Sequence, residues 1–281
     1  MQTVQTVDAV AVNCDLMKIK SFNNKELKDL TDNDKLEESL HDYDKSEMDN
    51  PNEAITKFDS NLFRQLEEMA LSEGAVSIGF CKITDDLILN DYNITYRNAI
   101  VLIYPLDMRI IESDPGVIAQ TYNDYLYDRI AGLTYKMSDF LRNNNVATEV
   151  FHPKHDEYLA YSKVAELANL GKIGDSGLLI TPQLGPRIKI SVILTSIEDL
   201  PYPNENDYQW MKEYCDSCKA CKKACKQNAL SDDCLDTELC IGCSQGCSYC
   251  ISACPFYKKG YDHVKKIFEK LESKRKNKVE V

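Results

Sequence analysis

The chain has 281 residues, a formal net charge of −12 and a pI near 4.9, a length that allows one sizeable domain with a smaller module. Because affinity for nucleic acid comes largely from Lys and Arg that neutralise phosphates, this acidity argues against a nucleic-acid partner. The sequence contains no apolar run of membrane-spanning length and no secretory or twin-arginine leader. We therefore expect a cytoplasmic protein that does not enter the membrane.

The first 55 residues differ in composition from the rest of the chain. They include DLTDNDKLEESLHDYDKSEMDNPNE, which has many carboxylates, few aromatic residues and no sustained apolar period. Residues 1–60 hold 14 acidic and seven basic side chains, and so account for 7 of the 12 net negative charges. This composition predicts an acidic, disordered tail over residues 1–55.

From residue 56 the hydrophobic pattern becomes that of a folded domain. Leu62, Phe63 and Leu66 fall on one face of a helix, and the apolar runs that follow predict strands. Strands that alternate with helices indicate a layered α/β core over residues 56–205. The expected elements are a helix at 60–74, strands at 75–81 and 99–105, a helix at 117–145, a strand at 147–151, a helix at 159–170, and strands at 177–181 and 187–196.

The segment over residues 263–281 is predicted to form a basic amphipathic helix. Its sequence HVKKIFEKLESKRKNK carries many lysines, and Val264, Ile267 and Leu271 lie at helical spacing. We expect this helix to pack on the surface of the protein through those three side chains.

Ten of the 12 cysteines lie between Cys215 and Cys254. The first run, CDSCKACKKAC, has the spacing C-x2-C-x2-C-x3-C, and the second, CIGCSQGCSYCISACP, ends at Pro255. Three closely spaced thiolates can reach three corners of one cubane, and the fourth ligates the other cluster, as in two-cluster ferredoxins. The sequence therefore predicts a small bacterial-ferredoxin-like module with two [4Fe–4S] clusters over residues 206–262. The predicted ligands are Cys215, Cys218, Cys221 and Cys254 for cluster one, and Cys225, Cys247, Cys250 and either Cys240 or Cys243 for cluster two.

Other uses of these cysteines fit the pattern less well. Structural zinc explains paired CxxC motifs, but not a triplet followed by x3-C and nearly repeated before a proline. Disulfides require an oxidising compartment, for which the N-terminal sequence gives no sign. Cys14 and Cys81 are expected to be ordinary thiols, with Cys81 buried at the end of an apolar strand. Cys234 and Cys243 are spare thiols or alternative ligands.

A family resemblance is carried by the segment VAELANLGKIGDSGLLITPQLGPRIKISVILTSIEDLP (164–201) and the cysteine block directly after it. This order resembles epoxyqueuosine reductase and its relatives, the cobalamin-dependent iron–sulfur reductases that include reductive dehalogenases. Residues 122–141 are similar to the "DYH" helix of that family, with Tyr127 where a histidine is usual. The family's isolated ligand comes from an "RC-I" motif, which Cys240 and Ile241 match, so the resemblance favours Cys240 over Cys243. The resemblance as a whole covers about residues 60–260.

The resemblance implies a corrinoid-binding α/β core and a route for electrons. Two clusters would pass electrons, received from a ferredoxin- or flavodoxin-type donor, to a corrinoid that reduces a small-molecule substrate. The family's proton donor, an aspartate, corresponds best to Asp156, with His155, Tyr158 and Tyr161 as alternatives. The glycines expected beside the corrin ring are Gly171, Gly174, Gly177 and Gly185; from sequence alone, helix caps and tight turns explain them better, and the resemblance makes the two explanations equal.

Several positions depart from the family pattern. Lys172 stands in place of a tryptophan, and Asp175 and Ser176 in place of Lys-Asn. The first run ends at Cys225 without the usual proline. These departures, together with the acidity, argue against tRNA as the substrate. They also keep two other functions open: a cobalamin-free electron carrier, and an activator that reduces the corrinoid of a partner protein.

Overall fold

The computed structural model describes residues 45–155, 157–231 and 235–279, apart from the side chains of residues 243, 244 and 276–279. The tail over residues 1–44, together with Cys14, Asp156 and Cys234, therefore lies outside the described residues. Those that are described belong to one compact unit. Their mixture of helices and sheet confirms the mixed α/β class expected from the sequence.

The core is built on a four-stranded sheet in which every pair of neighbours is antiparallel. The strand order is β1-β2-β6-β3, and the two central strands are buried along most of their length, so both faces of the sheet are covered. The strands are β1 (Ser77–Lys82), β2 (Asn98–Pro105), β3 (Thr148–Phe151) and β6 (Ile188–Thr195). Four of the predicted strand regions therefore form the sheet, and the fifth, at 177–181, lies outside it.

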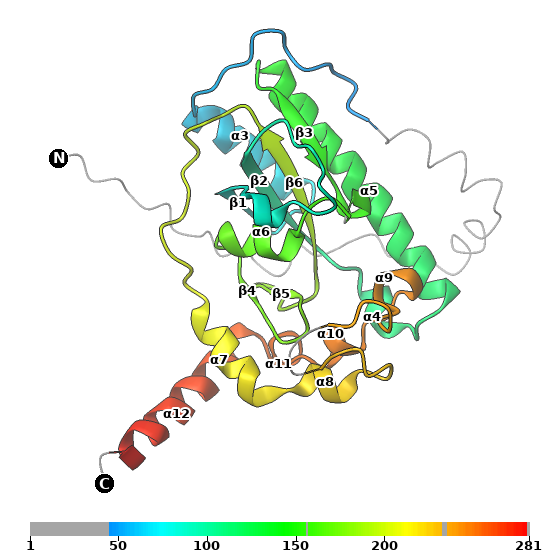
Figure 1. The fold of residues 1–281 in the computed structure, drawn as a ribbon, viewed down its shortest axis with the longest axis vertical. Helices are drawn as coiled ribbons and strands as arrows, with labels where there is room; N and C mark the ends of the chain where they lie inside the picture. Colours follow the sequence, from blue (N-terminus) through cyan, green and yellow to red (C-terminus); the bar gives the residue numbers. More distant parts are fainter. Residues whose placement is uncertain (1–44, 156, 232–234, 280–281) are drawn as a thin grey trace. The chain divides into compact units, whose positions relative to one another are not determined.

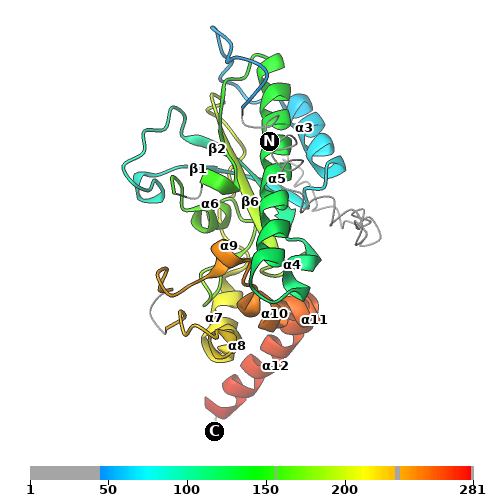
Figure 2. The ribbon, with the colours of Figure 1, turned by 90° about the vertical axis from the view of Figure 1, so that its right-hand side faces the viewer.

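Helices cover the two faces of the sheet, because successive side chains of a strand point to opposite sides. On β2, Ile100 and Leu102 pack with α3 (Ser60–Ser72) and α5 (Val117–Asn143). The alternate residues Val101 and Ile103 pack with α6 (Tyr161–Leu167) and with the loop after β1. Figures 1 and 2 show α3 and α5 on one side of the sheet and α6 on the other. The shorter helices of the core are η2 (Asp85–Leu87), α4 (Met108–Glu112) and η3 (Pro153–His155).

Residues 45–55 are held against the core, which corrects the expectation of a disordered tail for this stretch. The Asn50 side chain both donates to the Thr148 carbonyl (3.0 Å) and accepts from its N–H (2.8 Å), and so satisfies the edge of β3. The Asp139 carboxylate on α5 accepts from the N–H groups of Glu47 and Met48. The acidic composition did not reveal these contacts, because each depends on a single polar side chain.

The cysteine-rich segment packs on a small hairpin that lies beside the main sheet. The hairpin pairs β4 (Lys172–Ile173) with β5 (Leu179–Ile180), and a third apolar cluster joins it to the cysteine region through Ile180, Met211 and Phe256. In both ribbon views the cysteine helices gather toward the end of the molecule that holds α12 (Figures 1 and 2). They are α7 (Gln209–Cys218), α8 (Ala220–Ala224), α9 (Gly242–Gln245), α10 (Tyr249–Ala253) and α11 (Pro255–Lys259), followed by α12 (Tyr261–Val279).

The C-terminal helix forms as the sequence predicts, but it packs through fewer residues. Val264 is fully buried against the cysteine region, whereas Leu271 is 42% exposed. Aromatic side chains make the contact instead. The ring centre of Trp210 on α7 lies 5.3 Å from that of Tyr261 and 5.4 Å from that of Phe268. Among the helices of the described residues, none is both long enough and apolar enough to cross a membrane.

Candidate metal centre

The first cysteine run folds into two short helices with a sharp bend between them. Cys215 and Cys218 lie in the last turn of α7, and Lys219 then takes a left-handed conformation (φ 52°) that ends the helix. The second helix, α8, begins at once and carries Cys221. Cys225 follows it in extended backbone (ψ 105°). The bend turns the backbone within the run, so thiols that are close in sequence can converge.

The second run repeats this local structure. Gly246 (φ 64°) ends α9, Cys250 lies in α10, and Cys254 leaves that helix in extended backbone (ψ 129°) before Pro255 starts α11. Proline suits the first position of a helix, where its missing N–H has no partner to lose. The helices α8 and α10 pack against each other. The two runs are therefore similar in structure and adjacent in space.

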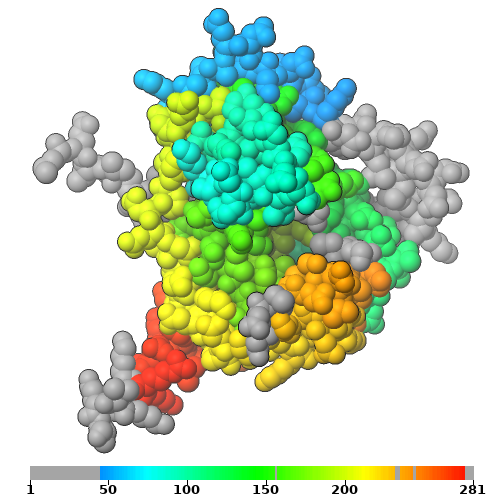
Figure 3. Space-filling view, viewed as in Figure 1, coloured from blue at the N-terminus to red at the C-terminus, as the bar shows by residue number. Residues whose placement is uncertain are grey.

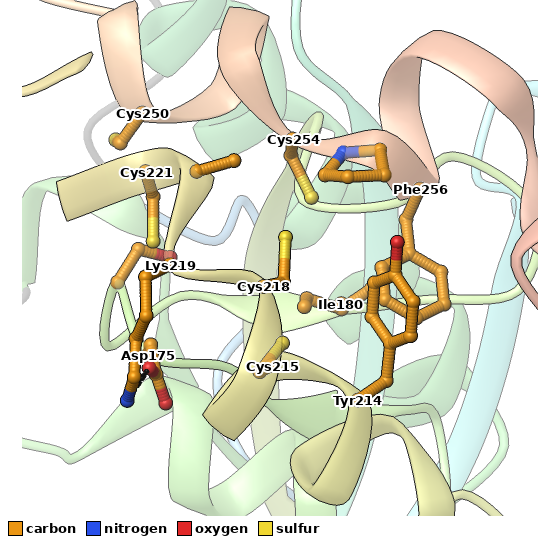
Figure 4. A pocket seen from close by; sticks show the side chains of 13 residues that line it. Asp175, Ile180, Tyr214, Cys215, Cys218, Lys219, Cys221, Cys250, Cys254 and Phe256 are labelled. Atoms are coloured by element: carbon orange, nitrogen blue, oxygen red, sulfur yellow. Dashed lines mark hydrogen bonds and ion pairs between the residues drawn. The ribbon is translucent and has the colours of Figure 1, made fainter. Parts of the chain in front are cut away.

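One pocket collects the thiols predicted for cluster one. It is lined by Cys215, Cys218 and Cys221 of the first run and by Cys254 of the second, with Cys250 also at its wall. In Figure 4 the sulfurs of Cys218 and Cys254 point toward the same space. Tyr214, Ile180 and Phe256 form the apolar side of the pocket. This convergence of Cys254 with the distant first run supports the crossed ligation, which remains a prediction.

The thiols predicted for cluster two also lie near one another. Burial is the main cause that raises the pKa of Cys247 and of Cys250, and neighbouring thiolates add to it: Cys240 and Cys225 for Cys247, and Cys247, Cys221 and Cys240 for Cys250. Cys240 is exposed, and its sulfur lies close to Gly242. The Cys243 side chain lies outside the described residues, so the preference for Cys240 stays a prediction from the resemblance.

Burial governs the protonation of these thiols. Desolvation raises the pKa of Cys215 and of Cys250 to about 12, and that of Cys254 to about 11. Backbone hydrogen bonds act in the opposite direction, from Asp175 to Cys215 and from Phe256 and Tyr257 to Cys254. Without a positive charge nearby, these thiols are protonated at neutral pH. A bound iron–sulfur cluster would supply that charge, and the backbone N–H groups would then stabilise the thiolates.

The candidate ligands are thiols held apart around one pocket. Within the described part of the chain, no group of three or more Cys, His, Asp or Glu side chains is close enough to hold one metal ion. The cysteine sulfurs bound to the corners of a cubane lie further apart than those around one ion. The donor set, made up of thiols in a largely apolar pocket, fits the [4Fe–4S] clusters that the spacing predicts.

A buried carboxylate ties the first run to the hairpin. The side chain of Asp175 is only 4% exposed and lies within 2.7 Å of Lys212 and 2.6 Å of Lys219, with Lys222 at 3.7 Å. Figure 4 shows Asp175 beside Lys219 at the edge of the pocket. Burial by itself raises the pKa of Asp175, but hydrogen bonds from Lys212 and Lys219 outweigh that effect and lower the pKa below its usual value. Asp175, which stands where the family pattern has Lys-Asn, therefore has its buried negative charge compensated by lysines in and just before the first cysteine run.

Protein atoms account for the glycines predicted to lie beside a corrin ring. A side chain at Gly171 would collide with the Ile180 carbonyl across the hairpin. Gly185 has a φ of +60°, and a Cβ there would lie 2.8 Å from the Tyr257 nitrogen. These two glycines allow the hairpin to close and to approach α11. Gly174 packs against Ile180 and Cys215, and Gly177 has a positive φ of 75°. Contact of the four glycines with a corrinoid stays a prediction.

A polar pair on α5 and β6 was not predicted as part of a site. The hydroxyl of Tyr127 lies 2.7 Å from the Lys189 nitrogen, and that nitrogen lies 4.3 Å from the centre of the Tyr127 ring. One turn earlier on α5, the Asn123 side-chain nitrogen is buried without a hydrogen-bond partner among the described residues. The pKa of Asp124 is raised by burial and by Asp128, against the effect of Lys154 and Lys189. This group has the polar side chains that a buried ligand requires.

The helix α5, which carries Tyr127 and Asn123, also packs against the second cysteine run. Gly246 approaches Ala119 so closely that a Cβ would lie 2.6 Å from the Ala119 backbone, and Gln245 accepts from the Gly116 N–H at 2.8 Å. At 1.5 Å per residue, the eight residues from Ala119 to Tyr127 span about 12 Å along α5. Sequence reasoning noted Tyr127 only as a replaced histidine, and no sequence signal paired it with Lys189.

The residues predicted as proton donors lie near η3. Asp156 is outside the described residues. His155 is half-buried and stacks on His152 with ring centres 3.9 Å apart, and desolvation lowers its pKa. Tyr158 packs on Tyr92 at 4.2 Å, and the Tyr161 hydroxyl donates to the His152 carbonyl at 2.8 Å. These three side chains form an aromatic group, and their role as donors stays a prediction.

Comparison with known proteins supports the resemblance inferred from the sequence. No family model matches the chain. A tetrachloroethene reductive dehalogenase of Desulfitobacterium hafniense is 30% identical over 137 residues, which are 49% of this chain and 24% of that protein. The chain thus spans about a quarter of the length of this relative.

Solved structures show the same fold. A catabolic reductive dehalogenase in complex with 3-bromo-4-hydroxybenzoic acid matches with a TM-score of 0.62 and 19% identity, covering 78% of this chain and 36% of that one. An epoxyqueuosine reductase with a tRNA stem loop matches with a TM-score of 0.52 and 20% identity, covering 71% and 66%. The resemblance is therefore confirmed: reductive dehalogenases are sequence relatives of this chain, and it shares a fold with both groups of reductases.

Proposed function

We propose that this protein is an oxidoreductase in which two [4Fe–4S] clusters relay electrons to a bound corrinoid, where a small-molecule substrate is reduced. The convergence of Cys215, Cys218, Cys221 and Cys254 in one pocket carries the proposal. The relatives named above are reductases, and a halogenated small molecule is the substrate class they suggest. Nucleic acid is not proposed as a substrate, because residues 1–208 carry a net charge of −16.

In this proposal the cysteine module holds and tunes the clusters. Cys215, Cys218, Cys221 and Cys254 would ligate cluster one, and Cys225, Cys240, Cys247 and Cys250 cluster two. Backbone N–H groups directed at the sulfurs stabilise the reduced, more negative state, because they interact most strongly where negative charge accumulates. The packing of α8 on α10 would keep the clusters adjacent, as a relay requires.

Tyr127 and Lys189 are suited to supply the proton that a reduction consumes. The phenol is a donor held 2.7 Å from an ammonium group, and that positive charge stabilises the phenolate left after the proton departs. The buried side-chain nitrogen of Asn123, which has no hydrogen-bond partner among the described residues, provides a further donor for a ligand in the same place. When bound, a corrinoid supplies metal-centred reduction; the residues of this chain bind, orient and deliver the proton.

A second function is favoured by the packing of the glycines. Protein atoms already occupy the space beside Gly171 and Gly185, so these positions have a structural role without any cofactor. A protein that held the clusters but no corrinoid would be an electron carrier, or an activator that reduces the corrinoid of a partner protein.

Anaerobic reconstitution distinguishes these functions. We expect about eight irons per chain, in accordance with two clusters, and about one cobalt after incubation with cobalamin. Reductive loss of chloride from tetrachloroethene would then test the enzyme. Full iron content with no cobalt uptake would leave the carrier or activator, and an iron content near zero would contradict the proposal altogether.

Separate Cys240→Ala and Cys243→Ala variants identify the eighth ligand. We expect the first to lose cluster two and the second to keep both clusters, because the Cys240 thiol lies among the other predicted ligands. Iron content and the electron paramagnetic resonance spectrum of the reduced protein measure the outcome. The reverse result would assign the role to Cys243.

A further inference from the structure

Charge is divided unevenly along this acidic chain. Residues 1–208 have a net charge of −16, whereas residues 209–281, which contain the cysteine module and α12, have a net charge of +4. The positive excess lies in residues 263–281, which belong largely to α12 and carry a net charge of +4, whereas residues 206–262, which hold the thiols, carry a net charge of −1. A sign reversal of this kind between two regions of one chain indicates an electrostatic surface rather than general solubility.

Within the module and α12, two sets of lysines have different surroundings. Lys212, Lys219 and Lys222 form ion pairs with the buried carboxylate of Asp175, and Lys212 also pairs with Asp216. A second set, which we call the basic rim, consists of Lys223, Lys258, Lys259 and Lys266. All four are exposed, and none forms an ion pair with another described residue. The charge of the basic rim is therefore available to a partner.

The basic rim adjoins the candidate ligands. Lys223 is two residues after Cys221, and Lys258 and Lys259 are four and five residues after Cys254. The helices that carry these lysines, α8, α11 and α12, lie together at the end of the fold that holds the cysteines (Figures 1 and 2). Figure 3 shows α8 at the lower edge of the surface, with α12 beside α7. Cys218 and Cys221 are half-buried and Cys240 is exposed, so clusters held there would lie near this surface.

We infer that the basic rim is the docking surface for an acidic one-electron carrier protein of the ferredoxin or flavodoxin type. The inference rests on the proposed function and names the partner of its clusters. One electron passes from the reduced carrier to an oxidised cluster, and no bond forms or breaks. Opposite charge speeds the encounter and orients the carrier toward the module, while the acidic remainder of the surface repels it elsewhere.

The test uses the anaerobic, iron-loaded full chain and a purified acidic flavodoxin, chemically reduced, in a stopped-flow instrument. The variant K223E/K258E/K259E is compared with K57E/K82E/K163E, which changes the same charge at three exposed lysines outside the module. We expect the second-order rate constant for cluster reduction to fall on the order of tenfold in the rim variant, with little change in the control variant. Iron content and the rate of reduction by dithionite should match the wild type in both.

The ionic-strength series on the wild type requires no variant. We expect the rate constant to fall steeply as salt rises, and the rim variant to lose most of that dependence. Equal rate constants for the two variants, or a wild-type rate that does not respond to salt, would overturn the inference. So would tighter binding of a labelled RNA hairpin by the wild type than by the rim variant without any effect on reduction. Wild-type protein without iron would instead contradict the proposed function, and the inference with it.

Discussion

At the scale of single residues, Asp175 has the most specific surroundings in the candidate metal centre. A carboxylate that is 4% exposed must be compensated, and here the compensation comes from lysines before and within the first cysteine run. We therefore expect Asp175 to be a positioning residue that holds the predicted ligands of cluster one against the hairpin.

Asp175→Asn tests this role. The amide keeps the shape but leaves the lysines unneutralised, so we expect a loss of about 1–3 kcal/mol of stability and a higher midpoint potential for cluster one than for the unchanged cluster two. Because the pKa of Asp175 is lowered, its stabilising effect is present above the ordinary carboxyl pKa of 3.8 and is lost as the pH falls below it. Melting curves at several pH values and a redox titration followed by electron paramagnetic resonance measure both effects. An unchanged potential would leave Asp175 with a purely structural role.

Tyr127→Phe tests the second polar group. The ring and its packing remain, but the hydroxyl next to Lys189 is lost. If the phenol donates a proton, we expect turnover to fall between about 100-fold and 10,000-fold, while iron content and cobalamin uptake stay unchanged. Tyr125→Phe, at a 40% exposed tyrosine on the same helix, is the matched control. Equal turnover in the two variants would exclude Tyr127 as the donor.

At the scale of elements, the β4–β5 hairpin connects the sheet to the cysteine module. It is short, with two residues in each strand, and it depends on close backbone approach at both ends. Gly185 provides that approach toward α11, because its φ of +60° and its nearest neighbours both exclude a side chain.

Gly185→Ala should therefore loosen the attachment of the module. Gly260→Ala is the matched control, since Gly260 also has a positive φ, of 79°, but has nothing within 4 Å of a built Cβ. We expect both substitutions to strain the backbone. Gly185→Ala should lower the melting temperature by several degrees more than Gly260→Ala does, since each kcal/mol of lost stability lowers it by about 2–4 °C. Thermal denaturation of the two iron-loaded proteins makes the comparison. Similar melting temperatures would mean that contact with α11 adds little.

The elements that the sequence predicts well are those with a continuous local signal. The apolar runs at 99–105 and 187–196 correspond to β2 and β6, and the long periodic segment at 117–145 corresponds to α5. The bend at Lys219 has no such signal, because a left-handed lysine is imposed by the packing of the thiols. The spacing of the cysteines predicted which thiols meet. It could not predict the Tyr127–Lys189 pair, because those residues lie 62 positions apart and meet only when α5 packs on the sheet.

At the scale of the whole molecule, the cysteine region is attached to the core by a small apolar cluster that includes two of the thiol residues themselves, Cys215 and Cys254. The stability of the module and the occupancy of its clusters are therefore linked. Ligands that bind only the folded state raise its stability.

Removal of iron should destabilise the protein. We expect a chelator under reducing conditions to lower the melting temperature by several degrees, and the loss of iron to be faster at pH 6 than at pH 8. Burial raises the pKa of Cys215 and Cys250 to about 12, so protons compete with iron for these sulfurs and more so as the pH falls. Visible absorbance of the clusters follows the loss. Equal rates at the two pH values would mean that ligand protonation does not limit release.

The meeting of Cys254 with Cys215 in one pocket also has a consequence for the order of events during synthesis. The ribosome delivers the first three thiols of this pocket well before the fourth, since 32 residues separate Cys221 from Cys254. At about 5–20 residues per second, the incomplete set waits for a few seconds. In that interval the first three thiols are present without the fourth, so they can bind iron early or become oxidised. The number of residues between the two cysteine runs therefore sets the order in which the predicted ligands of cluster one become available.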